Sequence, residues 1–355
     1  MAPRTDIHFH VFGDDTDIER AKRDEALFFY PKDNQHWETW ITNGVLEASL
    51  EAYEKELGLC GRLTTDVYFD IARMTLSRSR WIDNAVLLAL DALFDEQGNL
   101  DPVKTDLWVP NRFLAGRIKI ANDRLADGGQ PTKRFLLGAS VHPYRRDWSA
   151  RLDEALALGA RLIKLIPSVQ HIDLGRVDRR YWKKLADDKL PLLLHVGPEY
   201  AFPEGRRRQD LDHVDKMDFA LREGVTVIAA HCASRVFFWD PDFVDALAAK
   251  MARRNTPGAT QLWADTSALC MWTRTGTTKH VLATIDPRYM LHGTDFPVSA
   301  DAAAFSPIDY PKMTWGAYSQ NVATKNPLDR DALIKRAIGL PDSVLEAAAN
   351  VLRPV

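Results

Sequence analysis

Side chains that can bind a metal ion occur at regular intervals along this sequence. They are His8, His10, Lys164, His195, His231, Asp265 and Asp295. From Lys164 onward the successive members are 31, 36, 34 and 30 residues apart. A unit of one strand, one helix and their connections takes about 30 residues or more. The spacing therefore predicts that each member from Lys164 onward ends a different strand of a repeating strand–helix fold.

His8 and His10 lie two residues apart in the segment TDIHFHVF (5–12). Side chains alternate between the two faces of a strand, so both imidazoles should share one face while Ile7 and Phe9 face the surrounding helices. Neutral imidazole is a good ligand for Zn²⁺, Fe²⁺ and Mn²⁺. The pair alone is weak evidence, but its combination with two histidines and an aspartate at later strand ends predicts a metal site.

Lys164 lies within the apolar segment RLIKLIP (161–167). An ammonium group in such surroundings needs a partner or a lowered pKa. Three interpretations stay open: Lys164 is N-carboxylated and bridges two metal ions, it remains an ammonium beside Asp295 or a substrate carboxylate, or it is structural.

Further polar residues follow the apolar segment at 135–143. His142 could face the site, and Arg145 and Arg146 could hold a substrate carboxylate through paired hydrogen bonds. Solvated loop charges are the alternative for at least one of the two arginines. His292 is expected to be a core histidine with satisfied hydrogen bonds rather than a ligand.

The elements that must position these residues are apolar strands alternating with amphipathic helices. Eight segments are expected to be strands, at 5–12, 85–93, 135–143, 161–167, 190–197, 225–232, 261–267 and 289–295. Such runs are typical of a parallel sheet buried on both faces, and 149–160 and 240–254 have helical spacing. Eight units predict a (β/α)₈ TIM barrel, with functional residues at the carboxyl ends of the strands. A doubly wound open sheet is disfavoured because no glycine-rich dinucleotide motif follows any segment.

Two regions depart from this repeat, and we assign both to one domain of residues 1–355. Residues 13–84 are far longer than a normal strand–helix loop. We expect them to form an insertion, with a helix at 42–58, that belongs partly to the helical layer and partly to a lid over the site. Residues 301–355 should form two closing helices, one from about Asp329 to Gly339 and one from Asp342.

Composition argues against several other classes of protein. The chain has 355 residues, a net charge of −3 and a pI near 6.4, whereas nucleic-acid binding usually requires a basic domain. It contains no run of 18 apolar residues and no signal-peptide core, so we expect no membrane partner. The sparse cysteines, Cys60, Cys232 and Cys270, predict buried thiols in a cytoplasmic protein. A closed homo-oligomer is the default assembly.

Four motifs resemble a known family. DIHFH, LLLHVG, IAAHCAS and HGTDFP, in this order, look like the amidohydrolase superfamily, and are closer to the branch that includes aminocarboxymuconate-semialdehyde decarboxylase and related TIM-barrel hydrolases. The resemblance covers nearly the whole chain outside 13–65. It is specific for the superfamily but not for a substrate.

The resemblance implies a set of roles at one divalent metal ion. His8, His10 and His195 would be ligands, and Asp295 would be a ligand or a proton carrier. His231 would act as an acid or base beside a single ion.

In members of the superfamily with two ions, the counterpart of His231 binds the second ion, and a carboxylated lysine at the position of Lys164 bridges the two. The sequence leaves the number of ions open. Zinc is the first expectation for their identity, with Mn²⁺ or Fe²⁺ as alternatives.

Two reactions and one non-catalytic role are compatible with such a site. In hydrolysis, water activated by the metal attacks an amide, ester or lactone carbonyl, Asp295 takes the proton, and the metal or His231 stabilises the oxyanion. In non-oxidative decarboxylation, Arg145 or Arg146 anchors an aromatic or unsaturated acid, and Asp295 or His231 protonates carbon. A metal-binding barrel without activity is the third alternative. We favour hydrolysis.

Overall fold

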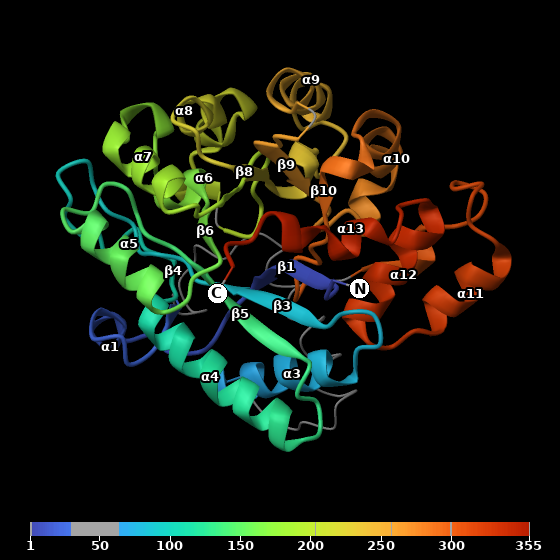
Figure 1. The fold of residues 1–355 in the computed structure, drawn as a ribbon, viewed down its shortest axis with the longest axis horizontal. Helices are drawn as coiled ribbons and strands as arrows, with labels where there is room; N and C mark the ends of the chain where they lie inside the picture. Colours follow the sequence, from blue (N-terminus) through green and yellow to red (C-terminus); the bar gives the residue numbers. More distant parts are fainter. Residues whose placement is uncertain (1, 30–63, 203, 257, 299, 355) are drawn as a thin grey trace.

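Eight parallel strands form the core of the computed structural model, which describes residues 2–29, 64–202, 204–256, 258–298 and 300–354 (Figure 1). In sheet order they are β1 (Thr5–His10), β3 (Asn84–Leu88), β5 (Arg134–Ala139), β6 (Leu162–Leu165), β7 (Leu192–Leu194), β8 (Val227–Ala229), β9 (Leu262–Asp265) and β10 (Met290–Leu291). The two end strands close the sheet, because Ile7 N donates to His292 O and His10 N donates to Phe296 O, both at 2.9 Å. The predicted (β/α)₈ barrel is therefore confirmed, and the open-sheet alternative is wrong.

Helices surround the barrel on its outer side (Figure 1). The longer ones are α3 (Thr65–Arg78), α4 (Asn111–Asp127), α5 (Trp148–Ala157), α7 (Arg179–Asp187), α9 (Val244–Arg254), α10 (Thr275–Thr284), α11 (Trp315–Ala323) and α12 (Pro327–Ile338). Short helices are α1 (Ile18–Lys22), α6 (Pro167–Gln170), α8 (Asp218–Arg222) and α13 (Ser343–Glu346). The helices expected at 149–160 and 240–254 are α5 and α9. None of the described helices combines the length and apolarity needed to cross a bilayer.

The strands are shorter than the apolar segments that predict them. β7 ends at Leu194 and β8 at Ala229, so His195 and His231 lie just beyond the strands rather than on them. The apolar residues that follow the strands are buried in the core but lie outside the strands themselves. This places the polar residues in the loops at the carboxyl end of the barrel, where a (β/α)₈ fold carries its functional groups.

A bulge in β1 changes the expected alternation of side chains. The register pairs Asp6 with Ala85 and then Phe9 with Leu87, which leaves an extra residue in β1 between them. Ile7 consequently packs inside the barrel, while Phe9 packs against the helices. The expectation that Ile7 faces the helices is wrong, because strict alternation does not hold across a bulge.

The insertion and the C-terminal region are only partly as expected. The helix expected at 42–58 lies outside the described residues. In the described part, β2 (Phe28–Phe29) pairs antiparallel with β4 (Leu107–Trp108), and α3 joins the helical layer. The first closing helix, α12, starts at Pro327 because Asn326 caps it, and it ends at Gly339, whose φ is +115°.

The second closing helix, α13, follows Asp342 as expected, and α11 is an additional helix that the sequence pattern did not indicate. Cys232 and Cys270 are buried and free, in agreement with prediction. Cys60 lies outside the described residues.

Candidate metal centre

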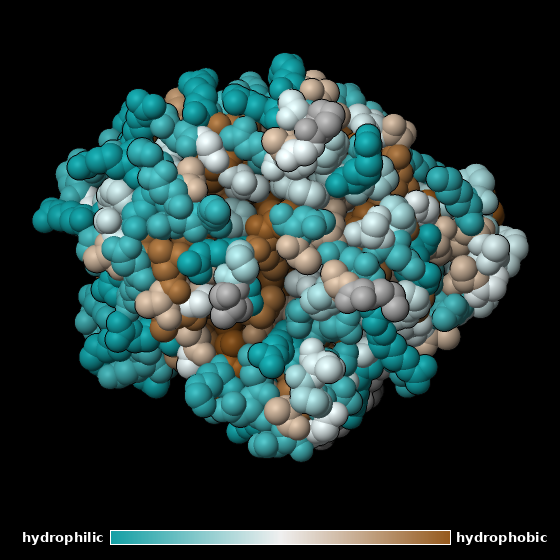
Figure 2. All heavy atoms as spheres, viewed as in Figure 1, coloured by the Kyte–Doolittle hydropathy of each residue, from teal (hydrophilic) through white to brown (hydrophobic). Residues whose placement is uncertain are grey.

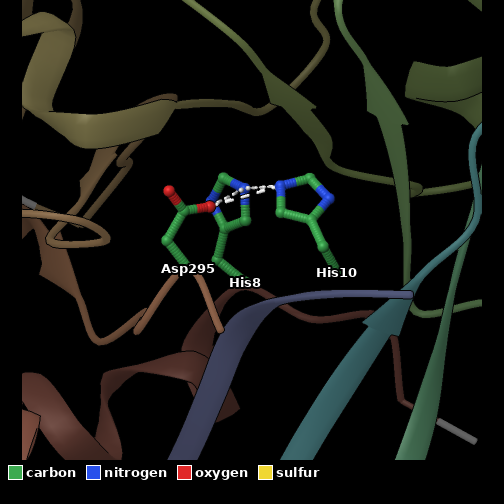
Figure 3. A group of neighbouring side chains, drawn as sticks. All are labelled: His8, His10 and Asp295. Atoms are coloured by element: carbon green, nitrogen blue, oxygen red, sulfur yellow. Dashed lines mark hydrogen bonds and ion pairs between the residues drawn. The ribbon is translucent and has the colours of Figure 1, made fainter. Parts of the chain in front are cut away.

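Three side chains converge at the carboxyl end of β1 (Figure 3). His8 Nε2 lies 3.0 Å from His10 Nε2 and 3.4 Å from Asp295 Oδ1, and His10 Nε2 lies 3.2 Å from the same oxygen. The side chain of His8 is fully buried, whereas those of His10 and Asp295 are 21% and 13% exposed. Two imidazole nitrogens and a carboxylate oxygen thus meet at a point that solvent can reach.

Asp295 reaches this point from an uncommon backbone conformation. Its φ is +70°, and its N–H donates to His8 O at 2.9 Å. The preceding residue, Thr294, donates from N and from Oγ1 to the buried carboxylate of Asp6. Asp6 in turn accepts from His8 N, so one carboxylate ties the end of β1 to the loop after β10. Left-handed backbone held in this way is typical of functional sites.

Asp265, at the end of β9, fixes the orientation of His8. Its Oδ2 lies 2.7 Å from His8 Nδ1, and its Oδ1 accepts from His231 N at 3.0 Å and from Ser267 N at 2.8 Å. Burial alone would raise the pKa of Asp265, but the adjacent His8 and its hydrogen bond lower this pKa below its usual value. An ionised acceptor at Nδ1 keeps the proton there and leaves the Nε2 lone pair for a metal.

Lys164 belongs to the same cluster. Its Nζ lies 3.3 Å from His8 Nε2, the nitrogen that faces His10 and Asp295. Burial lowers the pKa of Lys164, while the charges of Asp265 and Asp295 oppose that shift. Its location fits both the ammonium and the carboxylated interpretation.

His231 and His195 extend the cluster along the barrel mouth. The His231 ring centroid lies 5.1 Å from that of His8 and 5.1 Å from that of His195. Burial lowers the pKa of His231 well below its usual value and that of His195 to about 4, so both rings are neutral at pH 7. The backbone at His231 is left-handed, with φ of 55°, which turns the ring into the mouth directly after β8.

The donors present fit a divalent cation. His195 Nε2 is buried and has no hydrogen-bond partner among the described residues. His8 Nε2, with the proton held at Nδ1, is an acceptor that faces another acceptor, Asp295 Oδ1. A cation is the kind of group that satisfies acceptors gathered in this way, and mixed imidazole and carboxylate ligands suit Zn²⁺, Mn²⁺ and Fe²⁺. The group His8, His231 and Asp265 is also compact, but its ring nitrogens already have hydrogen-bond partners, Asp265 for His8 Nδ1 and Ser267 Oγ for His231 Nδ1.

The structure gives Arg145 and Arg146 partners other than a substrate. Arg145 pairs with Asp91 at 3.1 Å and with Asp147 at 2.9 Å. Arg146 donates to Gln97 O and to the side chain of Asn99. Both guanidinium groups thus serve to hold the loops that follow β3 and β5.

His142 is buried and forms local hydrogen bonds. Its Nε2 lies 2.9 Å from Gln170 O, and its Nδ1 accepts from Tyr144 N at 3.2 Å. This pairing fixes one neutral tautomer, because the carbonyl requires a donor at Nε2 and the amide requires an acceptor at Nδ1. His292 is also buried, as expected, but neither of its ring nitrogens has a hydrogen-bond partner in the described chain. The prediction that its hydrogen bonds are satisfied is therefore wrong.

The tautomer of His142 predicts how stability depends on pH. Burial lowers the pKa of His142 to about 3, whereas the unfolded chain takes up this proton near pH 6.5. The unfolding free energy should therefore fall as pH drops from 6.5 toward 3, with His142 contributing about 1.4 kcal/mol per pH unit. His142→Gln, which cannot titrate, should reduce the slope between pH 6 and 4 by about this amount in urea denaturation. An unchanged slope would contradict the assignment.

Arg274 is a buried cation that sequence reasoning missed. It ends a 3₁₀ helix, η7 (Trp272–Arg274), in the loop between β9 and α10, and is 3% exposed. Its Nη1 donates to Ser234 O at 2.9 Å and to Ser234 Oγ at 2.6 Å, while its Nε has no hydrogen-bond partner among the described residues. Burial lowers the pKa of Arg274, and Asp295 is the first of the charges that oppose this shift. No carboxylate of the described chain forms an ion pair with it.

Comparisons with known proteins add a similarity to solved structures. No family model and no curated protein sequence matches the chain. A proposed metal-dependent hydrolase from Lactobacillus casei is 13% identical with a TM-score of 0.48, the match covering 99% of this chain and 97% of that one. A 5-carboxyvanillate decarboxylase from Sphingomonas paucimobilis is 12% identical, with a TM-score of 0.44 and coverage of 98% and 97%.

A dihydroxybenzoic acid decarboxylase from Polaromonas, crystallised with manganese, is 14% identical, with a TM-score of 0.43 and coverage of 96% and 98%. At these identities and scores the similarity says nothing about the reaction of this chain, which we infer from its own side chains.

Proposed function

We propose that this chain is a metal-dependent hydrolase that acts on a small carbonyl compound, an amide, ester or lactone, bearing a carboxylate group. The observation that carries the proposal is the convergence of His8, His10 and Asp295 on one accessible point. We assign His8, His10, His195 and Asp295 as the residues that hold the ion. When bound, a divalent ion supplies a water molecule that is nucleophilic at neutral pH.

Asp295 and His231 carry the proton chemistry in this proposal. Burial would raise the pKa of Asp295, but the hydrogen bond from His10 is among the contacts that keep this pKa below its usual value, so the carboxylate is ionised and can accept a proton from the attacking water. His231 is neutral, and in the tautomer whose Nδ1 accepts from Ser267 Oγ, 2.8 Å away, its Nε2 can donate a hydrogen bond to the oxygen of the carbonyl under attack. The proton on Asp295 then passes to the leaving group.

Lys164 has two roles open to it within this proposal. As an ammonium, with its Nζ 3.3 Å from His8 Nε2, it would neutralise the charge of Asp295 or of a substrate carboxylate. As a carbamate it would be a further oxygen ligand, and the site would hold two ions. We propose Zn²⁺ as the ion, with Mn²⁺ or Fe²⁺ as alternatives.

Arg274 supports a carboxylate-bearing substrate. A buried guanidinium without a carboxylate partner is costly, and a bound anion would remove that cost. Ser234 connects it to the loop of His231, because Ser234 Oγ donates to His231 O at 2.6 Å. The anion that Arg274 holds would therefore lie beside the loop that carries a proposed catalytic histidine.

This role predicts a change in substrate preference. We expect the wild type to turn over acid members of a panel of lactones, esters and amides about 10- to 100-fold better in kcat/KM than matched members without the carboxylate, the range of one or two charged hydrogen bonds. Arg274→Met should abolish this preference, and Arg274→Lys should keep part of it. A wild-type preference that survives in Arg274→Met would rule out the role.

The same carboxylate subsite would also serve a decarboxylase, so the products must separate the two reactions. Turnover in ¹⁸O-labelled water should place the label in the carboxylic acid product without release of CO₂. Release of CO₂ with no label incorporated would replace hydrolysis by decarboxylation. A chain that binds the ion but turns over no member of the panel would be a non-catalytic metal-binding barrel.

A further inference from the structure

The barrel has a second hollow at the end opposite the metal cluster. It lies where β1, β3 and β5 begin, on the face that carries both termini, and its volume is about 690 Å³. Figure 2 shows this face, with apolar residues along a hollow near its centre and hydrophilic residues around it. We call this hollow the basal cavity.

Among the described residues, four cationic side chains and no acidic ones line the basal cavity. They are Arg134 at the start of β5, Arg161 just before β6, Lys189 just before β7, and Arg353 in the C-terminal segment. The chain as a whole has more acidic than basic residues, and most of its described arginines form ion pairs. None of these four pairs with a carboxylate of the described chain.

Two of the cations are held next to each other. Arg161 Nη1 donates to Arg353 O at 2.5 Å, and Arg353 N donates to Arg161 O at 3.1 Å. Burial and the nearby charge of Arg353 lower the pKa of Arg161. Arg353 Nε donates to the backbone oxygen of Asp188 at 3.3 Å, while the Asp188 carboxylate pairs with Lys184 at 3.0 Å. A pair of like charges without a carboxylate partner in the described chain is a cost that a bound anion would remove.

The floor of the basal cavity is apolar. Leu136, Ala348, Val351 and Leu352 line it and also pack onto the interior of the barrel. A ligand that fits must therefore combine negative charge with an apolar body, as small-molecule sites usually do with a few placed polar groups on apolar walls.

We propose that the basal cavity binds an organic phosphomonoester, whose dianionic phosphate lies among Arg134, Arg161, Lys189 and Arg353 and whose apolar group lies on the leucine-lined floor. Guanidinium groups match the oxygens of a phosphate through paired hydrogen bonds. The site is independent of the proposed reaction, because it lies at the opposite end of the strands.

Phenyl phosphate is the probe for this proposal, titrated calorimetrically into the full-length, metal-loaded protein. It should bind with one site per chain, and at least tenfold more tightly than inorganic phosphate because only the ester covers the floor. Arg161→Met and Arg353→Met should each weaken binding about tenfold. Arg288→Met, which removes an exposed arginine paired with Asp286, should leave binding unchanged and serves as the control.

A further variant separates this site from the metal centre. Arg274→Met removes the buried guanidinium proposed above to hold the substrate carboxylate and should leave the titration unaltered. The proposal is overturned if Arg274→Met abolishes binding, if Arg161→Met and Arg353→Met bind as the wild type does, or if inorganic phosphate binds as tightly as the ester. Arg134→Met, at an exposed residue, repeats the test should either of the first two variants fail to fold.

Discussion

Asp295→Asn is expected to lower kcat about 10³-fold while the protein retains its metal. The amide cannot accept the proton that attacking water releases, which removes general-base catalysis. His8, His10 and His195 remain to hold the ion, so its stoichiometry should not change. The measurement is kcat on a substrate from the lactone, ester and amide panel, together with the metal content of the same preparation.

A carboxylate at the surface provides the matched control. Asp309→Asn removes the exposed partner of Lys279 and should leave both kcat and metal content at wild-type values. Full activity in Asp295→Asn would refute the role of Asp295 as proton acceptor. Loss of the metal together with activity would show that Asp295 acts chiefly as a ligand.

Asp265→Asn is expected to weaken metal binding about 10- to 100-fold. Both oxygens of Asp265 accept hydrogen bonds, one from His8 and the other from His231 N and Ser267 N. An amide offers one oxygen only, so its NH₂ group must face a donor. Either His8 loses the partner that fixes its tautomer, or the loop of His231 moves.

Competition with a chelator measures this change in the dissociation constant of the metal. Asp187→Asn, on the exposed side of α7, is the control, since that carboxylate pairs only with Lys183 in the described chain. A dissociation constant for Asp265→Asn within about twofold of wild type would show that His8 needs no such support.

The barrel and the core of the site follow from spacing in the sequence. Apolar segments that recur about every 30 residues and end in His195, His231, Asp265 and Asp295 leave few folds other than a closed parallel barrel. The structure brings the first and last strands together, so that Asp295 meets His8 although 287 positions separate them. The spacing between strands and the position of a residue at the end of a strand can both be inferred from the sequence alone.

Other features depend on contacts that the pattern does not contain. The bulge that turns Ile7 inward arises from the pairing of β1 with β3. Asp265 was noticeable for its position in the repeat, but its contact with His8 Nδ1 requires the closed barrel. Arg274 lies in an ordinary polar loop, and only its burial distinguishes it from the solvated arginines. Arg145 shows the opposite case, because the sequence suggested that it could hold a substrate carboxylate, whereas two carboxylates of the chain itself bind it.

The most direct test is anomalous diffraction at the zinc edge on crystals of protein purified without chelator and supplied with Zn²⁺. We expect one strong peak bounded by His8 Nε2, His10 Nε2 and the carboxylate of Asp295, with a second peak beside Lys164 only if that lysine is carboxylated. An ordered His8 and His10 with no anomalous density between them and Asp295 would contradict the metal centre and the hydrolase that depends on it.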